Sequence, residues 1–449
     1  MSNKFPFSFI TKEKVRSYEN NLIFSHVLGY VGYKKDLKEQ KLNNLKFGIS
    51  GIEKTFDKKL LGTDGWIKLE TNSKGRIKKE LNKKIAIPGE NINTNLIAPL
   101  QEKAYSLLSE IRGAAVVIDC KTGGVNCMVS TPSFDNDEFS NGVSSQKWNR
   151  LVIDESNPLL NRCVSGLYSP GSIYKLLTAL FVLEKMGFNK NTKYFCPGFV
   201  EFGNRKFHCW KKEGHKSLDL SEAIKKSCDC YFYNLAKNIN IDDLSSFSNQ
   251  FSIGKLTDID MPDESGGLMP DSKWKKKNRG EKWQRGETLN TVIGQGFTLS
   301  TPLQITLMTA RIASGKNLQP KILKRNRYFF ENINVSEENL DFIRNSMLRV
   351  VNEFEGTAFR SRLQSGLKMA GKTGTSQVRR ITKEERESGV LKNEELAYKL
   401  RDHSLFTGYA PYDNPRFAIT VVAEHMGNGS KVAAPISKKI IDFALRSFS

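Results

Sequence analysis

The chain has no long apolar run, no export signal and few cysteines. Among its 449 residues the longest strongly apolar stretch without charge, residues 176–183, is far shorter than the roughly 20 residues that a membrane-spanning helix needs. The first residues contain no apolar segment followed by a small-residue cleavage site, which a secretory signal requires. We therefore expect a soluble chain without a membrane span. If the protein works outside the cytoplasm, we expect its anchor to be missing from this sequence.

Seven cysteines are too few for a small domain built on disulfides. The 69 Lys and Arg residues exceed the 48 Asp and Glu residues, which gives a formal net charge of +21 and favours anionic surroundings. No nucleic-acid-binding motif accompanies this charge, so we expect no nucleic-acid partner. Proximity to an anionic membrane surface explains the basic excess better.

The length suits two or three domains. Glycine-rich turns and short apolar stretches predict a small, strand-rich accessory domain over residues 1–95, and residues 96–449 then form the second domain.

Within the second domain, alternating strand and turn signals predict a hairpin over residues 114–129. Strands at both ends of a domain with helices between them indicate an α/β (α+β) domain whose antiparallel sheet unites its two ends. A long solvated connection is expected over residues 379–402. The helices are expected at residues 100–111, 172–186, 219–238, 302–314 and 435–447, and the later strands at residues 368–379, 403–410 and 416–425.

One Ser-x-x-Lys pattern, Ser172 and Lys175, has a context that the others lack. A loop ends just before Ser172, and the following residues are apolar on nearly every side, which is typical of a buried central helix. A lysine in such surroundings loses solvation, which lowers its pKa toward the range of a general base. By chance the pattern also occurs at Ser144/Lys147, Ser252/Lys255, Ser272/Lys275 and Ser365/Lys368.

A second cation would lower the pKa of Lys175 further, and Lys372 is the candidate because it lies in a strand with hydroxyls and glycine, Lys372-Thr373-Gly374-Thr375. The same three letters at residues 121–123 fall at a predicted hairpin tip, so we interpret them as a turn. Between the two lysines lies Ser227-Cys228-Asp229, at the start of a second apolar helix.

SxxK, then SxD, then KTG in this order resembles the penicillin-recognising serine enzymes. The closer resemblance is to class B penicillin-binding proteins of the penicillin-binding protein 2 type, and it extends over essentially the whole chain. The segments that carry it are residues 26–32, 50–65, 119–135, 161–175, 227–236, 294–305, 370–378 and 401–411.

This resemblance implies a transpeptidase domain with an antiparallel sheet flanked by helices, preceded by a β-rich pedestal domain without its membrane anchor. Ser172 would attack a D-Ala-D-Ala stem peptide with Lys175 as general base, and Ser227, Asp229 and Lys372 would complete the catalytic set. Substrate would lie along Thr373, Gly374 and Thr375, and the backbone N–H groups of Ser172 and Thr375 would form the oxyanion hole.

The implied activity is peptidoglycan D,D-transpeptidation in lateral cell-wall elongation and cell shape, on the periplasmic face of the bacterial inner membrane. The implied partners are stem peptides of the lipid-linked precursor polymer, β-lactams, a glycosyltransferase and a scaffold protein of the rod complex. Alternatives on the same fold are a β-lactamase or D,D-carboxypeptidase, and a β-lactam sensor without turnover.

Three sulfurs and an imidazole from Cys196, Cys209, His215 and Cys228 form a Cys₃His set suited to one structural zinc ion. Some members of the resembled family carry zinc beside the active site at these positions, with two Asp residues where this chain has Cys. A Cys196–Cys209 disulfide is the alternative. Two other residues, His208 and Cys230, could replace members of the set.

Overall fold

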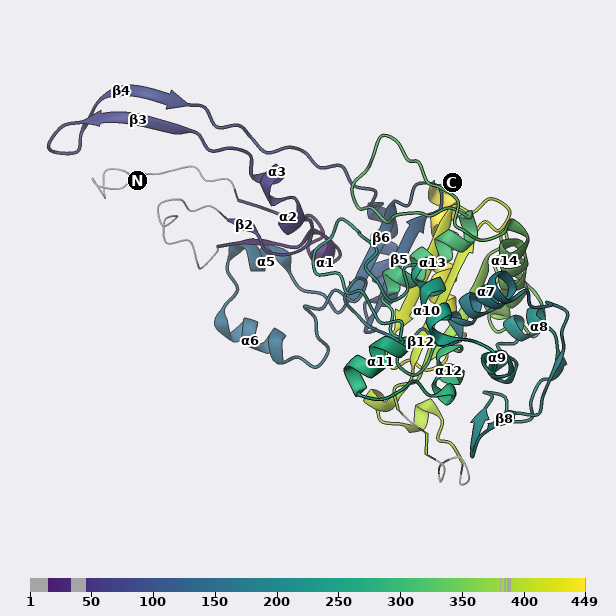
Figure 1. Ribbon diagram of the computed structural model, residues 1–449. Coiled ribbons are helices and arrows are strands. Elements are labelled where there is room, and N and C mark those ends of the chain that lie inside the picture. Colours follow the sequence, from purple (N-terminus) through teal and green to yellow (C-terminus); the bar gives the residue numbers. More distant parts are fainter. Residues whose placement is uncertain (1–14, 34–45, 380, 383–384, 386–388, 449) are drawn as a thin grey trace. The chain divides into compact units, whose positions relative to one another are not determined.

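The computed structural model describes residues 15–33, 46–379, 381–382, 385 and 389–448 (Figure 1). The described residues form two compact units, one within residues 1–91 and 133–154 and the other within residues 92–132 and 155–449. No helix in these described ranges combines the length and the hydropathy that crossing a membrane requires.

The first unit consists of short helices, two small strand pairs and an excursion over residues 133–154. The excursion belongs here because Ser140 accepts a hydrogen bond from the Val31 backbone at 3.1 Å and Asn136 donates one to the Gly29 carbonyl at 3.0 Å. The elements are α1 (Ser25–Leu28), β1 (Val31–Gly32), β2 (Phe47–Gly48), α2 (Gly51–Thr55), α3 (Asp57–Leu61), β3 (Trp66–Thr71), β4 (Ile77–Lys84), α5 (Asn136–Asn141) and α6 (Ser145–Ile153).

The β3–β4 hairpin of this unit is exposed along its whole length (Figure 1). Its antiparallel register pairs Trp66 with Lys84, and irregularities interrupt the ladder after Lys68 and after Glu70. Gly75 turns the chain at the tip with a φ of 73°, which favours glycine.

The second unit is built on a five-stranded antiparallel sheet in the order β11-β12-β13-β5-β6. In the sequence, β5 and β6 come first, and β11, β12 and β13 come last. The two groups meet where β13 pairs with β5, so the sheet unites the two ends of the domain, as predicted. The strands are β5 (Gly113–Asp119), β6 (Val125–Thr131), β11 (Ala370–Ser376), β12 (His403–Ala410) and β13 (Phe417–Ala423).

Helices cover both faces of the sheet. Thr407 bonds Thr309 of α13 (Pro302–Ser314) at 2.7 Å, whereas Ser404, three residues earlier on β12, accepts from Ala433 at the start of α16 (Ala433–Phe448) at 3.1 Å. Residues three apart on a strand point to opposite faces. All seven residues of β13 are consequently buried.

The other helices of the second unit surround this core, and short strands lie beside them. The α-helices are α4 (Ala98–Leu108), α7 (Lys175–Met186), α8 (Leu220–Lys225), α9 (Asp229–Ala236), α10 (Ile241–Asn249), α11 (Ser272–Arg279), α12 (Arg285–Thr291) and α14 (Glu337–Asn352). The 3₁₀ turns are η1 (Gly171–Ile173), η2 (Phe359–Ser361), η3 (Asn393–Glu395) and η4 (Tyr398–Leu400), and the short strands are β7 (Tyr194–Cys196), β8 (Phe199–Phe202), β9 (Arg205–His208) and β10 (Lys216–Leu218).

Two expectations are resolved by local geometry. The Lys-Thr-Gly copy at residues 121–123 is a hairpin turn, since the Asp119 carboxylate accepts from the backbones of Lys121 and Thr122 and Gly123 has a φ of 69°. The single helix expected over residues 219–238 is wrong: α8 ends before Ser227, whose φ of 55° is left-handed and breaks the helix. Part of the connection expected over residues 379–402 lies outside the described residues.

Candidate active site and sulfur cluster

The Ser172 hydroxyl lies on η1, immediately before α7. The turn approaches β11 closely, because a Cβ added to Gly171 would stand 2.4 Å from the Thr375 carbonyl oxygen. A Cβ on Gly374 would likewise stand 2.8 Å from the Pro170 carbonyl. Glycines on both sides therefore let η1 and β11 touch through their backbones. Ser172 is half-buried.

The Lys175 side chain begins α7 and is fully buried. Its amine donates to the Asp229 carboxylate at 2.7 Å, to the Ser227 carbonyl at 2.9 Å and to the Ser227 hydroxyl at 3.3 Å. Buried charges of opposite sign require this kind of close pairing, because desolvation costs each of them several kcal/mol. The pair fixes the amine beside the Ser227 hydroxyl.

Lys372 approaches the same hydroxyl from β11. Its amine donates to Ser227 Oγ at 2.9 Å and to the Thr373 carbonyl at 3.2 Å, and the side chain is fully buried. Burial first, and then the nearby charge of Lys175, hold the pKa of Lys372 well below its usual value of 10.5. The Ser227 hydroxyl thus lies between two buried amines.

Asp229 opens α9 and faces Lys175. Burial raises the pKa of its carboxyl, and the charge of Lys175 opposes that rise. Its second oxygen, Oδ2, accepts from the Trp210 backbone N–H at 2.9 Å. Asp229 therefore connects the lysine to the loop that contains Trp210.

Thr373, Gly374 and Thr375 lie on β11, the strand at the border of the sheet. One side of β11 pairs with β12, and a border strand can pair with an added extended peptide on its other side. The Thr373 hydroxyl bonds that of Thr357 at 2.7 Å, and Gln295 donates to the Thr375 carbonyl at 3.0 Å. These three residues are consequently held beside η1.

A sulfur cluster adjoins the catalytic candidates. The metal-ligating atoms of its four residues all lie within 4.8 Å of one another, and His215 Nδ1 is 3.5 Å from Cys209 Sγ and 3.7 Å from Cys196 Sγ. All seven cysteines of the chain are free and buried. The cluster consists of Cys196, Cys209, His215 and Cys228.

The donors of this cluster suit a soft metal ion. The neighbouring thiol of Cys228 lowers the pKa of Cys196 to about 5, and it also lowers that of Cys209, so two thiolates are favoured. The His215 Nε2 atom is buried and has no hydrogen-bond partner in the described part of the chain. Of the two alternative ligands, His208 lies on β9 with its ring 6.2 Å from that of Phe199, and Cys230 lies outside the group of four.

Trp210 is a site residue that sequence reasoning missed. Its indole N–H donates to the Ser227 carbonyl at 3.0 Å, although 59% of the residue is exposed. Its position next to Cys209 was the only available signal.

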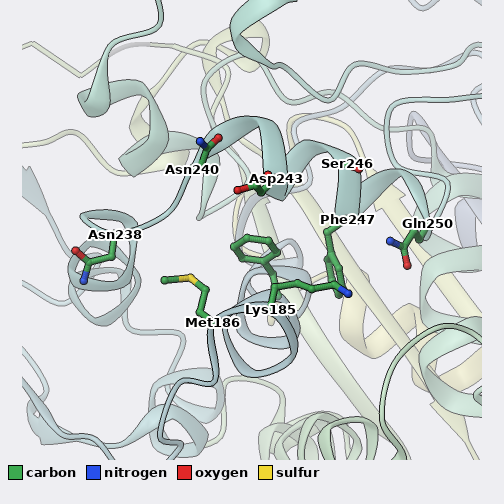
Figure 2. A pocket seen from close by; sticks show the side chains of 9 residues that line it. Lys185, Met186, Asn238, Asn240, Asp243, Ser246, Phe247 and Gln250 are labelled. Carbon is green, nitrogen blue, oxygen red and sulfur yellow. The ribbon is translucent and has the colours of Figure 1, made fainter.

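A hollow of about 490 Å³ lies elsewhere, between the end of α7 and α10 (Figure 2). Figure 2 shows side chains from both helices around it, and none belongs to the site described above. Its lining residues are Phe181, Lys185, Met186, Asn238, Asn240, Asp243, Ser246, Phe247 and Gln250.

Two family models match the chain. The penicillin-binding protein transpeptidase domain matches residues 113–442, and the penicillin-binding protein dimerisation domain matches residues 1–94. A curated relative, the peptidoglycan D,D-transpeptidase MrdA of Haemophilus influenzae, is 35% identical over 96% of this chain and 69% of its own length.

Solved structures give the same similarity. The complex between penicillin-binding protein 2 and MreC from Helicobacter pylori has a TM-score of 0.86 at 34% identity and covers 96% of this chain and 79% of its counterpart. Pseudomonas aeruginosa penicillin-binding protein 2 in complex with WCK 5153 has a TM-score of 0.84 at 33% identity and covers 98% of this chain and 93% of its own.

Proposed function

This chain belongs to the penicillin-binding protein transpeptidase family, and from that premise we propose how its residues carry out the reaction. It is a peptidoglycan D,D-transpeptidase of the penicillin-binding protein 2 type, which cross-links stem peptides in cell elongation. One observation carries the proposed mechanism: two buried lysines share the hydroxyl of Ser227 beside the turn that bears Ser172.

Acylation begins at Ser172. Its oxygen attacks the carbonyl carbon of the penultimate D-Ala, and Lys175 acts as the general base that takes its proton. The oxyanion that develops accepts hydrogen bonds from the backbone N–H groups of Ser172 and Thr375. The close approach of Gly171 to Thr375 supports this pairing of donors.

The C–N bond then breaks, and the terminal D-Ala leaves as an amine that needs one proton. Ser227 passes that proton on, because its hydroxyl lies within 3.3 Å of the Lys175 amine and 2.9 Å of the Lys372 amine. A neighbouring stem-peptide amine attacks the ester next and gives up a proton, and the Ser172 oxygen leaves and takes one back. One peptide bond is broken and one is formed.

Lys372 serves in this scheme as a proton-transfer group that is poised by burial. Burial and the charge of Lys175 hold the pKa of this amine well below 10.5, which favours the uncharged, proton-accepting form more than in a solvated lysine. Asp229 holds Lys175 in place through the 2.7 Å ion pair.

The direct test is covalent labelling by a fluorescent penicillin. The wild-type chain should be labelled once, and Ser172→Ala should lose the label completely while its melting temperature is unchanged. Ser365→Ala is the matched control, since this exposed serine also stands three residues before a lysine. Persistent labelling of Ser172→Ala would overturn the assignment.

Turnover separates the transpeptidase from the alternatives. With a D-Ala-D-Ala stem peptide and an acceptor amine, the cross-linked product should form. Fast hydrolysis of bound penicillin indicates a β-lactamase, release of D-Ala without cross-linking indicates a carboxypeptidase, and labelling without any turnover indicates a sensor.

Cys196, Cys209, His215 and Cys228 are proposed to hold one zinc ion. The low thiol pKa of Cys196, the spacing of the four donors and the position of His215 Nδ1, 3.5 Å from Cys209 Sγ, support the fit. With four protein ligands, zinc would supply a structural cross-link and no water-activating position. Because Cys228 stands between Ser227 and Asp229, that cross-link would stabilise the segment that bears both.

Elemental analysis tests the metal. One zinc per purified chain is expected, and His215→Ala should lower that content severalfold, whereas Cys163→Ser should retain it because the Cys163 thiol instead donates to the Val129 carbonyl at 3.0 Å. Purified chain without metal and lighter by two hydrogens, the mass of a Cys196–Cys209 disulfide, would overturn the proposal.

The partners and location are proposed from the relatives. The similarity to a penicillin-binding protein 2 solved with MreC supports a rod-complex scaffold protein as partner. The family resemblance supports a glycosyltransferase that makes the precursor polymer, and work on the periplasmic face of the inner membrane. The net charge of +21 suits an anionic membrane surface nearby. Co-purification of tagged chain with both proteins from a cell envelope tests this set.

A further inference from the structure

Trp210 makes two directed contacts with the catalytic segment. Its backbone N–H donates to Asp229 Oδ2 at 2.9 Å, and its indole N–H donates to the Ser227 carbonyl at 3.0 Å and the Lys226 carbonyl at 3.2 Å. The indole ring packs edge-on against the His215 ring, with centroids 5.3 Å apart. One residue therefore reaches both Ser227 and Asp229.

Burial does not explain why a tryptophan occupies this position. With 59% of the residue exposed, a large part of its apolar surface stays in contact with water. The indole N–H is used nonetheless, and its acceptor is the carbonyl that also accepts from Lys175 at 2.9 Å. The directed bond to Ser227, rather than hydrophobic contact, accounts for the side chain.

Ser227 needs such support because its backbone is left-handed. Its φ of 55° is rare for a residue other than glycine, and surrounding contacts must hold it. If the Ser227 carbonyl rotated, the hydroxyl would leave the point where it meets Lys175 and Lys372. The position of the Ser227 hydroxyl, which relays the proton, therefore depends on the hydrogen bonds that the Ser227 carbonyl accepts.

We propose that Trp210 is a positioning residue, whose indole N–H holds the Ser227 backbone so that the Ser227 hydroxyl stays between the amines of Lys175 and Lys372. The inference rests on the proposed function, in which Ser227 relays a proton. Trp210 acts through Ser227 and does not itself exchange a proton.

The experiment is a double-mutant cycle on acylation by a fluorescent penicillin. Trp210→Phe keeps the ring and the backbone N–H but removes the indole donor. We expect the maximal acylation rate to fall about three- to tenfold, the range for one net hydrogen bond, while half-saturating penicillin is unchanged. In a Ser227→Ala background the same change should alter the rate less than twofold, because the hydroxyl that Trp210 positions is gone.

Three measurements make the result decisive. Melting temperature and zinc content of Trp210→Phe should match those of the wild type, and Trp66→Phe, the same change at an exposed tryptophan of the other unit, should leave acylation unchanged. An unaltered rate in Trp210→Phe, or an equal loss with and without the Ser227 hydroxyl, would overturn the inference. Failure of the wild-type chain to label at Ser172 would instead refute the proposed function.

Discussion

The β11–β12 ladder and the β3–β4 hairpin are both antiparallel pairs, yet they differ completely in burial. Every residue of β3 and β4 is exposed, whereas β12 is buried from Ser404 onward and six of the seven residues of β11 are buried. Helices cover both faces of the β11–β12 region. In the sheet, packing from neighbouring elements therefore fixes the position of a side chain. In the hairpin, only the strand that carries the side chain does so.

This difference explains where the chemistry can reside. An amine such as Lys372 loses its solvation only where packing excludes water on every side, and that loss lowers its pKa. The lysines of the hairpin, such as Lys79 and Lys84, are solvated. The same residue type is fully buried beside the site in one ladder and exposed to solvent in the other.

Removing an aromatic ring from the sheet should have the largest effect on stability. Phe406 is fully buried on β12, so Phe406→Ala should lower the free energy of unfolding of the second unit by about 3–5 kcal/mol. Urea denaturation followed by circular dichroism measures the change. A loss below about 1 kcal/mol would contradict the packing described here.

Adding a methyl group to the sheet should damage the site more than the fold. Gly374→Ala would place Cβ 2.8 Å from the Pro170 carbonyl and 3.1 Å from the Ile173 side chain, which forces η1 away from β11. We expect penicillin acylation to fall at least about a hundredfold, consistent with a displacement of about 1 Å near reacting groups. Gly75→Ala, whose Cβ would meet nothing within 4 Å, is the control and should acylate normally.

Replacing Lys372 by Met should abolish most activity and increase stability by about 1 kcal/mol, since burying an amine is costly. The pKa of Lys372 is lower in the folded protein than its usual value of 10.5, which applies to the unfolded chain. Between the folded-state pKa and 10.5, the unfolded chain therefore holds a proton on this amine that the folded chain lacks. Stability of the wild type therefore rises with pH across that window. The advantage of Lys372→Met should be largest below the folded-state pKa and vanish as pH approaches 10.5.

Thermal unfolding of both proteins from pH 6 to pH 10 measures this difference. An advantage that grows with pH would show that Lys372 is charged in the folded protein. Lys79→Met on the exposed hairpin is the control, and the pH profile of its stability is compared with that of Lys372→Met.

The smallest effect is expected on the hairpin. Leu69 is 42% exposed, so Leu69→Ala should change the free energy of unfolding by less than about 0.5 kcal/mol. Urea denaturation of the first unit checks it. A loss of several kcal/mol would mean that the hairpin is buried in solution, and the contrast with the sheet would fail.

Much of the fold could be predicted because its signals are local. The expected strand over residues 403–410 is β12 itself, and the helix over residues 302–314 is α13. The apolar run after Ser172 indicated a buried helix, and all residues from Lys175 to Leu183 are buried in α7. The candidate lysines, Ser227 and Asp229 also meet, as their motifs implied.

The features that were not predicted depend on long-range contacts. Nothing in residues 133–154 indicates that they pack with the first unit, because the hydrogen bonds responsible join them to Gly29 and Val31, about a hundred residues earlier. The break at Ser227 was missed because the helical pattern continues across it. The bonds that stabilise the break come from Lys175 and Trp210, which no local window contains.

The sheet stops at β11, so a peptide laid along that strand would become a temporary sixth member of the ladder. Its backbone amides would supply the hydrogen bonds that hold it there, and these groups are the same in every peptide. The open side of β11 would thus bind a peptide by its main chain, whatever the composition of that peptide.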